Sequence, residues 1–165
     1  MANPQGTELA RTIRSGMEEL QKVCAGMTED IASKAPADRW SPKQIVSHLT
    51  GQDGIGFMPA FERILAQDTP KIDIIAEDPF FTERRSRLTL KELLAEAAAE
   101  YTKIADLALS LSEDQLKRKA YIPLFKDTDL TEYPTLAAFM GGLCGWHMGF
   151  HIRHMKDVLK ELGVA

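Results

Sequence analysis

The chain has 165 residues, with 20 Lys and Arg against 24 Asp and Glu, which gives a formal net charge of −4. This length predicts one domain over residues 1–165, and a hydrophobic share of 44% is enough for a core, which excludes a wholly disordered chain. The mildly acidic balance argues against nucleic-acid binding, which depends on clustered positive charge, so we expect no nucleic-acid partner.

The first 14 residues lack a basic segment followed by an apolar run, so they predict neither a secretory signal nor a membrane anchor. We therefore expect a cytoplasmic protein that does not bind membranes. Cys24 and Cys144 are then expected to be free thiols. Because the sequence has no CxxC pattern, a thiolate-rich structural zinc site is not expected.

Apolar residues recur at three- and four-residue spacing in four long stretches, which predicts an all-α fold. The first helix is predicted over about residues 6–27. The second is predicted to begin after Ser41, with Pro42 in its first turn and Gln44 completing a capping box. It should continue to about residue 67, with a kink or break over 57–60 because Pro59 removes a backbone donor.

The third helix is predicted to begin after Thr89, with Glu92 completing a second capping box, and to end near residue 111. The fourth should run from Leu136 to about Leu162, with Gly163 as its stop. The connection over residues 68–88 is long enough to cross a bundle from end to end, so the second and third helices can run parallel.

Three of the four histidines fall within eight residues of the fourth helix, and they are His147, His151 and His154. Positions four apart on a helix differ by about 40° and 6 Å, so His147 and His151 can share one metal ion. His154 lies about 10.5 Å along the axis from His147, which favours a supporting role. His48 is the histidine of the second helix that can face this pair.

The residues near this cluster have both functional and ordinary interpretations. Gln52 is predicted one turn beyond His48 and could orient a water molecule, or could bond to backbone. Asp53 points about 140° away from His48, which favours a capping or supporting role. Cys144 could neighbour the site, although a buried free cysteine is usually a small core residue.

Three further groups have open interpretations. The four-residue spacing of Gly141, Gly145 and Gly149 indicates close backbone approach, at an inner contact or a dimer seam. Phe80 and Phe81 could cover one mouth of the site or anchor their loop. The cluster formed by Arg84, Arg85 and Arg87 could attract an anionic substrate or form a solvated surface.

Two segments of the sequence resemble the DinB-like family. The resemblance rests on Trp40-Ser-Pro-Lys-Gln-Ile-Val-Ser-His48-Leu followed by Asp53, and on His147-Met-Gly-Phe-His151-Ile. It implies a four-helix bundle with up-down-down-up order and a divalent-metal site, zinc or nickel, whose ligands correspond to His48, His147 and His151. It also implies a homodimer, because many relatives form dimers.

Characterised relatives are transferases, isomerases and hydrolases that use low-molecular-weight thiols, and the resemblance does not select among them. The sequence therefore predicts a metal-dependent enzyme, a transferase or hydrolase acting on a small molecule through an open metal site. The first alternative is a protein of the same fold that binds a metal or small ligand without catalysis. The second is a metal-free bundle that acts through protein interactions.

Overall fold

This computed structural model describes residues 3–164. Their regular secondary structure consists of helices, apart from two isolated β-bridges. This confirms the all-α prediction. The elements in chain order are α1 (Pro4–Cys24), α2 (Glu29–Ala32), α3 (Pro42–Thr50), α4 (Met58–Ala66), α5 (Glu83–Ser86), α6 (Leu90–Ser110), α7 (Glu113–Leu116), η1 (Pro123–Phe125), α8 (Leu136–Gly141), η2 (Gly142–His147) and α9 (Met148–Glu161).

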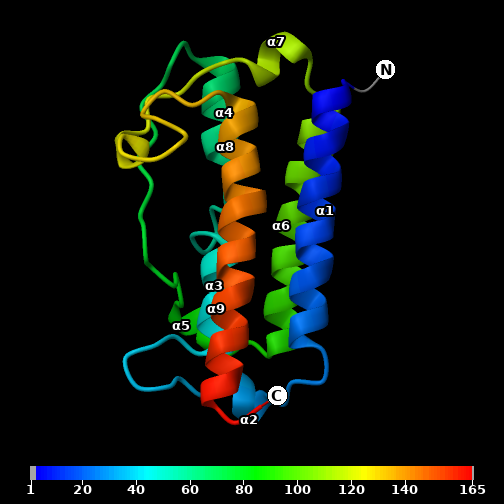
Figure 1. Ribbon diagram of the computed structural model, residues 1–165, viewed down its shortest axis with the longest axis vertical. Helices are drawn as coiled ribbons and strands as arrows, with labels where there is room; N and C mark the ends of the chain where they lie inside the picture. The colour runs from blue at the N-terminus through cyan, green and yellow to red at the C-terminus, as the bar shows by residue number, and fades with distance from the viewer. Residues whose placement is uncertain (1–2, 165) are drawn as a thin grey trace.

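Four rods make up the bundle: α1, α3 with α4, α6, and α8–η2–α9 as one continuous rod (Figure 1). In Figure 1, α1 and the last rod run downward, whereas α3–α4 and α6 run upward. Side-chain contacts agree with these directions. Gly6, near the start of α1, lies against Ala108 near the end of α6, and Leu9 of α1 lies beside Gly141 of the last rod.

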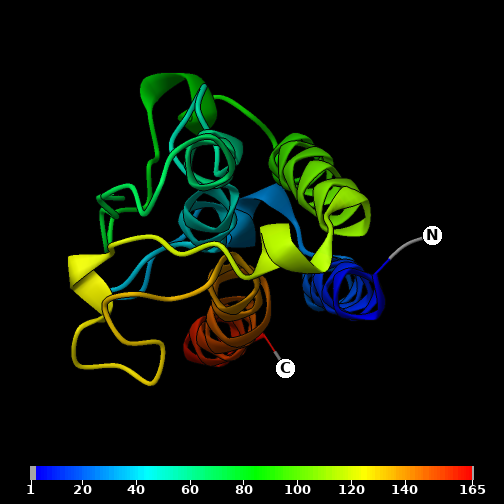
Figure 2. The same cartoon turned by 90° about the horizontal axis from the view of Figure 1, so that it is seen from above.

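The long crossover between α4 and α5 lets α3–α4 and α6 run in the same direction. It lies, together with the connection between α7 and α8, on the side of the bundle away from α1 (Figure 2). The two connections bind each other, because Ile72 N–H donates to the Tyr121 carbonyl and Tyr121 N–H donates to the Pro70 carbonyl, both at 2.9 Å. These backbone hydrogen bonds hold the crossover in place beside α3.

The second predicted helix is two helices, and the break lies earlier than predicted. α3 ends at Thr50 and α4 begins at Met58. Gly51 has a φ of +84°, in the left-handed region that favours glycine, so it stops the helix before Pro59 is reached. Pro59 sits in the first turn of α4, where its missing N–H costs nothing. A Cβ at Gly56 would lie 2.4 Å from a Glu100 oxygen, so this loop also requires glycine there.

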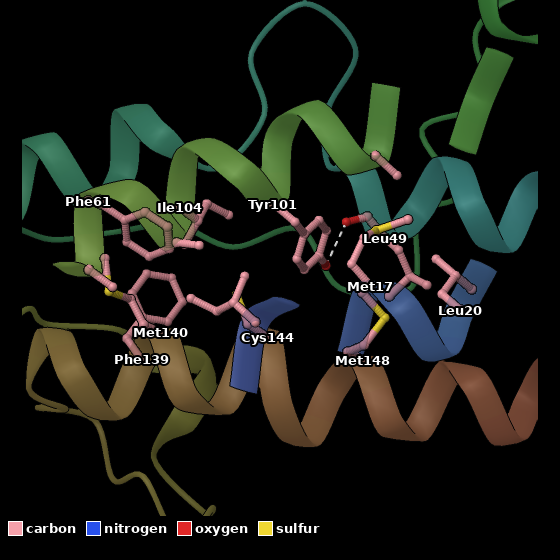
Figure 3. Close-up of a cluster of buried hydrophobic side chains, with 14 of the residues drawn as sticks. Met17, Leu20, Leu49, Phe61, Tyr101, Ile104, Phe139, Met140, Cys144 and Met148 are labelled. Carbon is pink, nitrogen blue, oxygen red and sulfur yellow. Dashed lines mark hydrogen bonds between the residues drawn. The ribbon is translucent and has the colours of Figure 1, made fainter. Parts of the chain in front are cut away.

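A continuous apolar core joins the four rods (Figure 3). The Phe61 and Phe139 rings meet edge to face at 5.3 Å, and Phe61 is fully buried. Tyr101 is also buried, and its hydroxyl donates to the Leu49 carbonyl at 2.9 Å. This bond accounts for the one polar atom that Tyr101 brings into the core, so the ring can be buried without an unsatisfied donor.

Two glycines that pack on helices should respond in opposite ways to alanine. A Cβ at Gly6 would lie 2.3 Å from the Ala108 carbonyl oxygen, a backbone atom that cannot turn away, so we expect Gly6→Ala to destabilise the fold by about 1–3 kcal/mol. A Cβ at Gly141 would meet only Leu9 at 3.7 Å, so Gly141→Ala should gain up to about 1 kcal/mol of helix propensity. Urea unfolding of both variants tests this, and a stabilised Gly6→Ala would contradict it.

Candidate metal centre

Three histidines from two rods converge between α3 and α9. One ring nitrogen from each of His48, His147 and His151 lies within 4.8 Å of the others. Nε2 of His48 and Nε2 of His147 are 3.0 Å apart. The His48 and His151 rings lie 4.5 Å apart, and the His147 and His151 rings 4.6 Å apart.

This spacing fits a bound cation. Two nitrogens each about 2.05 Å from a tetrahedral ion are about 3.3 Å apart, close to the separation between His48 and His147. The Nε2 atom of His147, rather than its Nδ1, is the nitrogen that lies beside Nε2 of His48, so both rings present the same kind of donor to the space between them. The three imidazoles could therefore hold one divalent metal ion with small adjustments of their side chains.

The start of α3 places His48 as the sequence predicts. Ser41 Oγ accepts from the Gln44 N–H, and Gln44 Oε1 accepts from the Ser41 N–H, so the capping box is formed. Pro42 occupies the first turn of the helix. The helix therefore begins at a defined residue, and His48, near its end, is turned toward α9 and is only 6% exposed.

The last rod differs from the uninterrupted α-helix expected over Leu136–Leu162. Residues Gly142–His147 form a π-helical turn, and the α-helix resumes at Met148. Such turns have one more residue per hydrogen-bonded ring than an α-helix and are frequent at functional sites. Here the π-helical turn ends at His147, so it affects the direction of the His147 side chain relative to that of His151.

Asp78 and Phe80 of the crossover hold His48, and sequence reasoning did not assign this role to Asp78. Nδ1 of His48 lies 2.6 Å from the Asp78 carbonyl oxygen. A carbonyl can only accept, so Nδ1 carries the proton and Nε2 presents its lone pair to the other histidines. The Phe80 ring stacks on His48 at 6.0 Å and 2°. This supports the interpretation of Phe80 as a cover, whereas Phe81 packs against the core.

Trp40 and His154 contact His151 from the other side. The Trp40 indole is nearly parallel to the His151 ring, at 6.1 Å and 8°. Nδ1 of His151 lies 3.2 Å from Nδ1 of His154, so His154 has the supporting position predicted for it. The role of Trp40 was missed, although it lies in the motif that carried the resemblance, because only the folded chain brings residue 40 beside residue 151.

All three imidazoles are held in their neutral form at neutral pH. Burial is the main cause of the lowered pKa of each. The pKa of His147 falls to about 4, with His48 as a second cause, and that of His151 falls to about 2, with its three histidine neighbours adding to burial. Neutral imidazole is the form that binds a metal ion.

Gln52 and Asp53 do not belong to this cluster. The predicted position of Gln52, one helical turn beyond His48, is wrong, because α3 ends at Thr50 and the Gln52 side chain is exposed. Asp53 accepts hydrogen bonds from Thr82 at 2.6 Å and from Arg84 at 2.6 Å. Asp53 thereby joins the loop after α3 to α5. It has a supporting role in the fold, but it supports this loop and not the histidines.

The arginine cluster is not a free cationic surface. Arg84 pairs with Asp53 and Glu96, and Arg87 pairs with Glu83. Arg85 is only 3% exposed, so neither an anion-attracting role nor a solvated surface describes it. The Arg85 side chain is buried because its guanidinium contacts residues 47, 51 and 80. None of these residues is adjacent to Arg85 in the sequence.

Asp53 should make the fold sensitive to acid. The hydrogen bond from Arg84, followed by that from Thr82, lowers the pKa of Asp53 to about 2 from its ordinary 3.8. A carboxyl group whose pKa is lower in the folded chain adds stability above the ordinary pKa and loses it as pH falls from about 4 to 2. Urea unfolding of the wild type and of Asp53→Asn should therefore differ at pH 5 and converge near pH 2, whereas a constant difference would contradict this.

Both cysteines are core residues, as the ordinary interpretation of Cys144 predicts. Cys24 and Cys144 are free and buried. Burial raises the pKa of each thiol to about 12. Neither side chain supplies a thiolate at neutral pH.

Two of the three spaced glycines form an inner contact. The backbone at Gly141 approaches Leu9, and that at Gly145 approaches Thr12, both on α1. Gly149 is near only Arg153 of its own helix. A Cβ would lie 3.7 Å from Leu9 at Gly141 and 3.4 Å from Thr12 at Gly145, which are ordinary contact distances, so this inner contact does not require glycine. A search of the described residues finds no helix that is both long and apolar enough to span a membrane.

The chain is therefore a four-helix bundle that holds a three-histidine cluster between two antiparallel rods. No protein family profile matches the chain, and no curated protein matches it. Among solved structures it is similar to YfiT from Bacillus subtilis, with a TM-score of 0.79 and 21% identity over 100% of this chain and 91% of that one. YfiT is described as a probable metal-dependent hydrolase with an unusual four-helix bundle topology.

A protein of Streptococcus pneumoniae is also similar, with a TM-score of 0.61 and 16% identity over 96% of this chain and 94% of that one. The likeness to YfiT confirms the predicted four-helix bundle at the level of the fold.

Proposed function

We propose that this protein is a metal-dependent hydrolase that acts on a small molecule. The observation that carries the proposal is the convergence of His48, His147 and His151, with a ring nitrogen of each within 4.8 Å of the others. The structural similarity to YfiT, described as a probable metal-dependent hydrolase, supports it. His48, His147 and His151 would be the ligands of a divalent ion.

Such an ion, when bound, supplies a Lewis acid that polarises a substrate carbonyl or phosphoryl group and lowers the pKa of water. Side chains and backbone of the protein would surround and orient the ligands of this ion. Trp40 and Phe80 place aromatic rings against His151 and His48, so they exclude water from one side of each imidazole. The Asp78 carbonyl holds the proton of His48 on Nδ1, away from the nitrogen that faces the centre.

A second candidate is a protein that binds a metal or small ligand without turnover. The converging group found among residues 3–164 contains three histidines and no carboxylate, so a general base would have to come from outside that group. This observation favours binding alone over catalysis. The two candidates share the metal site and differ only in turnover.

Finer features of the proposal follow from the sequence. We propose zinc or nickel as the ion, because the DinB-like resemblance implies these two and neutral imidazole suits both. A low-molecular-weight thiol as substrate or co-substrate and thiol-dependent transfer rest on the resemblance alone, whereas the proposed cytoplasmic location rests on the sequence expectation given above. For a homodimer, the exposed and stacked Trp146 and Phe150 rings, 5.7 Å apart on the last rod, offer an apolar surface.

Metal analysis and a hydrolysis screen test the proposal. The chain is purified without a polyhistidine tag, its metal content is measured, and ester, amide, phosphoester and thiol-conjugate substrates are assayed with one equivalent of Zn²⁺ or Ni²⁺. We expect one ion per chain and a hydrolysis activity that is lost with a chelator and restored by the ion. One ion without turnover would favour the second candidate. A folded chain that binds neither ion would refute both.

A further inference from the structure

The crossover turn that covers His48 has an unfavourable backbone conformation. Phe80 has a φ of +50°, in the left-handed region that a bulky residue rarely adopts. Two hydrogen bonds hold it there: the Phe80 N–H donates to Asp78 Oδ1 at 2.7 Å, and the Ser47 hydroxyl donates to the Phe80 carbonyl at 3.0 Å. The turn therefore persists because the residues around it impose its shape.

Arg85 joins this turn to the end of α3 from inside the protein. Its Nη1 donates to the Gly51 carbonyl at 2.6 Å and to the Ser47 carbonyl and hydroxyl at 3.1 Å, and it lies 3.4 Å from the Phe80 carbonyl. The guanidinium is buried, and carboxylate oxygens of Asp53 and Glu96 lie 3.7 Å from its Nε. Those charges offset part of the cost of burying a cation.

The same turn supplies both groups that hold His48. Asp78 offers the carbonyl that accepts from Nδ1, and Phe80 offers the ring stacked on the imidazole. Ser47, which contacts both Arg85 and Phe80, immediately precedes His48 in α3. Arg85 and Ser47, which we call the clamp, thus connect the end of α3 at the residue before His48 to the turn that fixes the proton of His48.

We propose that Arg85 and Ser47 are positioning residues that fix the tautomer and orientation of His48, keeping its proton on Nδ1 and its Nε2 directed at the metal centre. This inference rests on the proposed function for its purpose, since the lone pair on Nε2 is what a metal ion requires. The tautomer itself is a property of the metal-free chain. It can therefore be measured whether or not the protein binds a metal.

Imidazole nitrogen NMR of the metal-free protein is the direct test. Signals of His48 are assigned by comparison with His48→Gln, and the tautomer is read from the ¹⁵N shifts of its ring. We expect the wild type to carry the proton on Nδ1. Ser47→Ala removes the hydroxyl at a buried position without adding volume, and Arg85→Lys removes the fork of donors while it keeps the charge. Both should shift His48 toward a mixture of tautomers.

Thr50→Val is the matched control. Thr50 is buried in the same helix, and its hydroxyl donates to the Val46 carbonyl at 2.8 Å without joining the clamp. We expect this variant to keep the wild-type tautomer. Zn²⁺ affinity should fall by about 10- to 100-fold in Ser47→Ala and Arg85→Lys, the range for losing an outer partner of a ligand, and stay near the wild-type value in Thr50→Val.

Two results would overturn the inference: a wild type with the His48 proton on Nε2, or a folded Ser47→Ala with an unchanged tautomer. If Arg85→Lys does not fold, Ser47→Ala still decides the question. If the wild type binds no Zn²⁺, the proposed function fails, whereas the tautomer of the metal-free variants continues to test the clamp. The two failures are therefore distinguishable.

Discussion

Replacing His147 with alanine is expected to lower the affinity for Zn²⁺ by more than 100-fold. Loss of an outer partner costs about 10- to 100-fold, and loss of a ligand should cost more. Nε2 of His147 lies 3.0 Å from Nε2 of His48, so the substitution removes a nitrogen that faces the centre of the cluster. Isothermal titration calorimetry of tag-free protein measures the change, with circular dichroism to show that the variant is folded.

His154→Ala is the matched control for this prediction. His154 lies on the same helix and its Nδ1 contacts Nδ1 of His151 at 3.2 Å, yet it is not in the converging group. Its removal should therefore weaken Zn²⁺ binding by no more than about 10- to 100-fold. If the two variants lose the same affinity, the assignment of His147 as a ligand and His154 as a support is wrong.

Phe61→Ala is expected to destabilise the fold by about 3–5 kcal/mol, the usual cost of removing a buried aromatic side chain. Phe61 is fully buried and packs edge to face on Phe139, so alanine would leave a cavity between α4 and α8 (Figure 3). For a chain of this size the midpoint of thermal unfolding should fall by roughly 6–20 °C. Urea unfolding gives the free energy directly.

Phe150→Ala provides the comparison, because the Phe150 side chain is 46% exposed. Its free energy of unfolding should change much less than that of Phe61→Ala, since the ring leaves no closed cavity when removed. Zn²⁺ binding by folded Phe61→Ala should remain, because Phe61 is not among the converging histidines. Equal destabilisation of the two variants would contradict the position of the core described above.

Local signals predicted the starts of the helices well, because a cap is formed by residues close in sequence. Ser41 with Gln44 and Thr89 with Glu92 both form the predicted capping boxes. The break in the second helix was predicted too late in the chain, because the prediction relied on the missing N–H of Pro59. The helix ends earlier because Gly51 adopts a positive φ. The π turn before Met148 was missed because its residues also suit an α-helix.

The histidine cluster was predictable from spacing and resemblance, since His147 and His151 lie one turn apart and His48 is in a matching helix. The groups that orient those imidazoles were largely beyond prediction. The Asp78 carbonyl belongs to the backbone, so the type of residue at position 78 does not indicate its role. Arg85 is buried, although an arginine in a run of charged residues is usually exposed to solvent. Both depend on contacts across more than 25 positions of the chain.

Local signals in the sequence established that the chain is helical, where several of its helices begin, and that His147 and His151 share one face, because caps and periodicity act over a few residues. His48 is 99 positions from His147, and its match to that pair came from the resemblance and the facing direction of its helix. Only the tertiary structure decided what surrounds those imidazoles. The path of the crossover brings Asp78 and Phe80 onto His48, and the packing of α3 against α9 brings Trp40 onto His151. The protonation and orientation of a ligand depend on those distant neighbours, which meet only when the bundle closes.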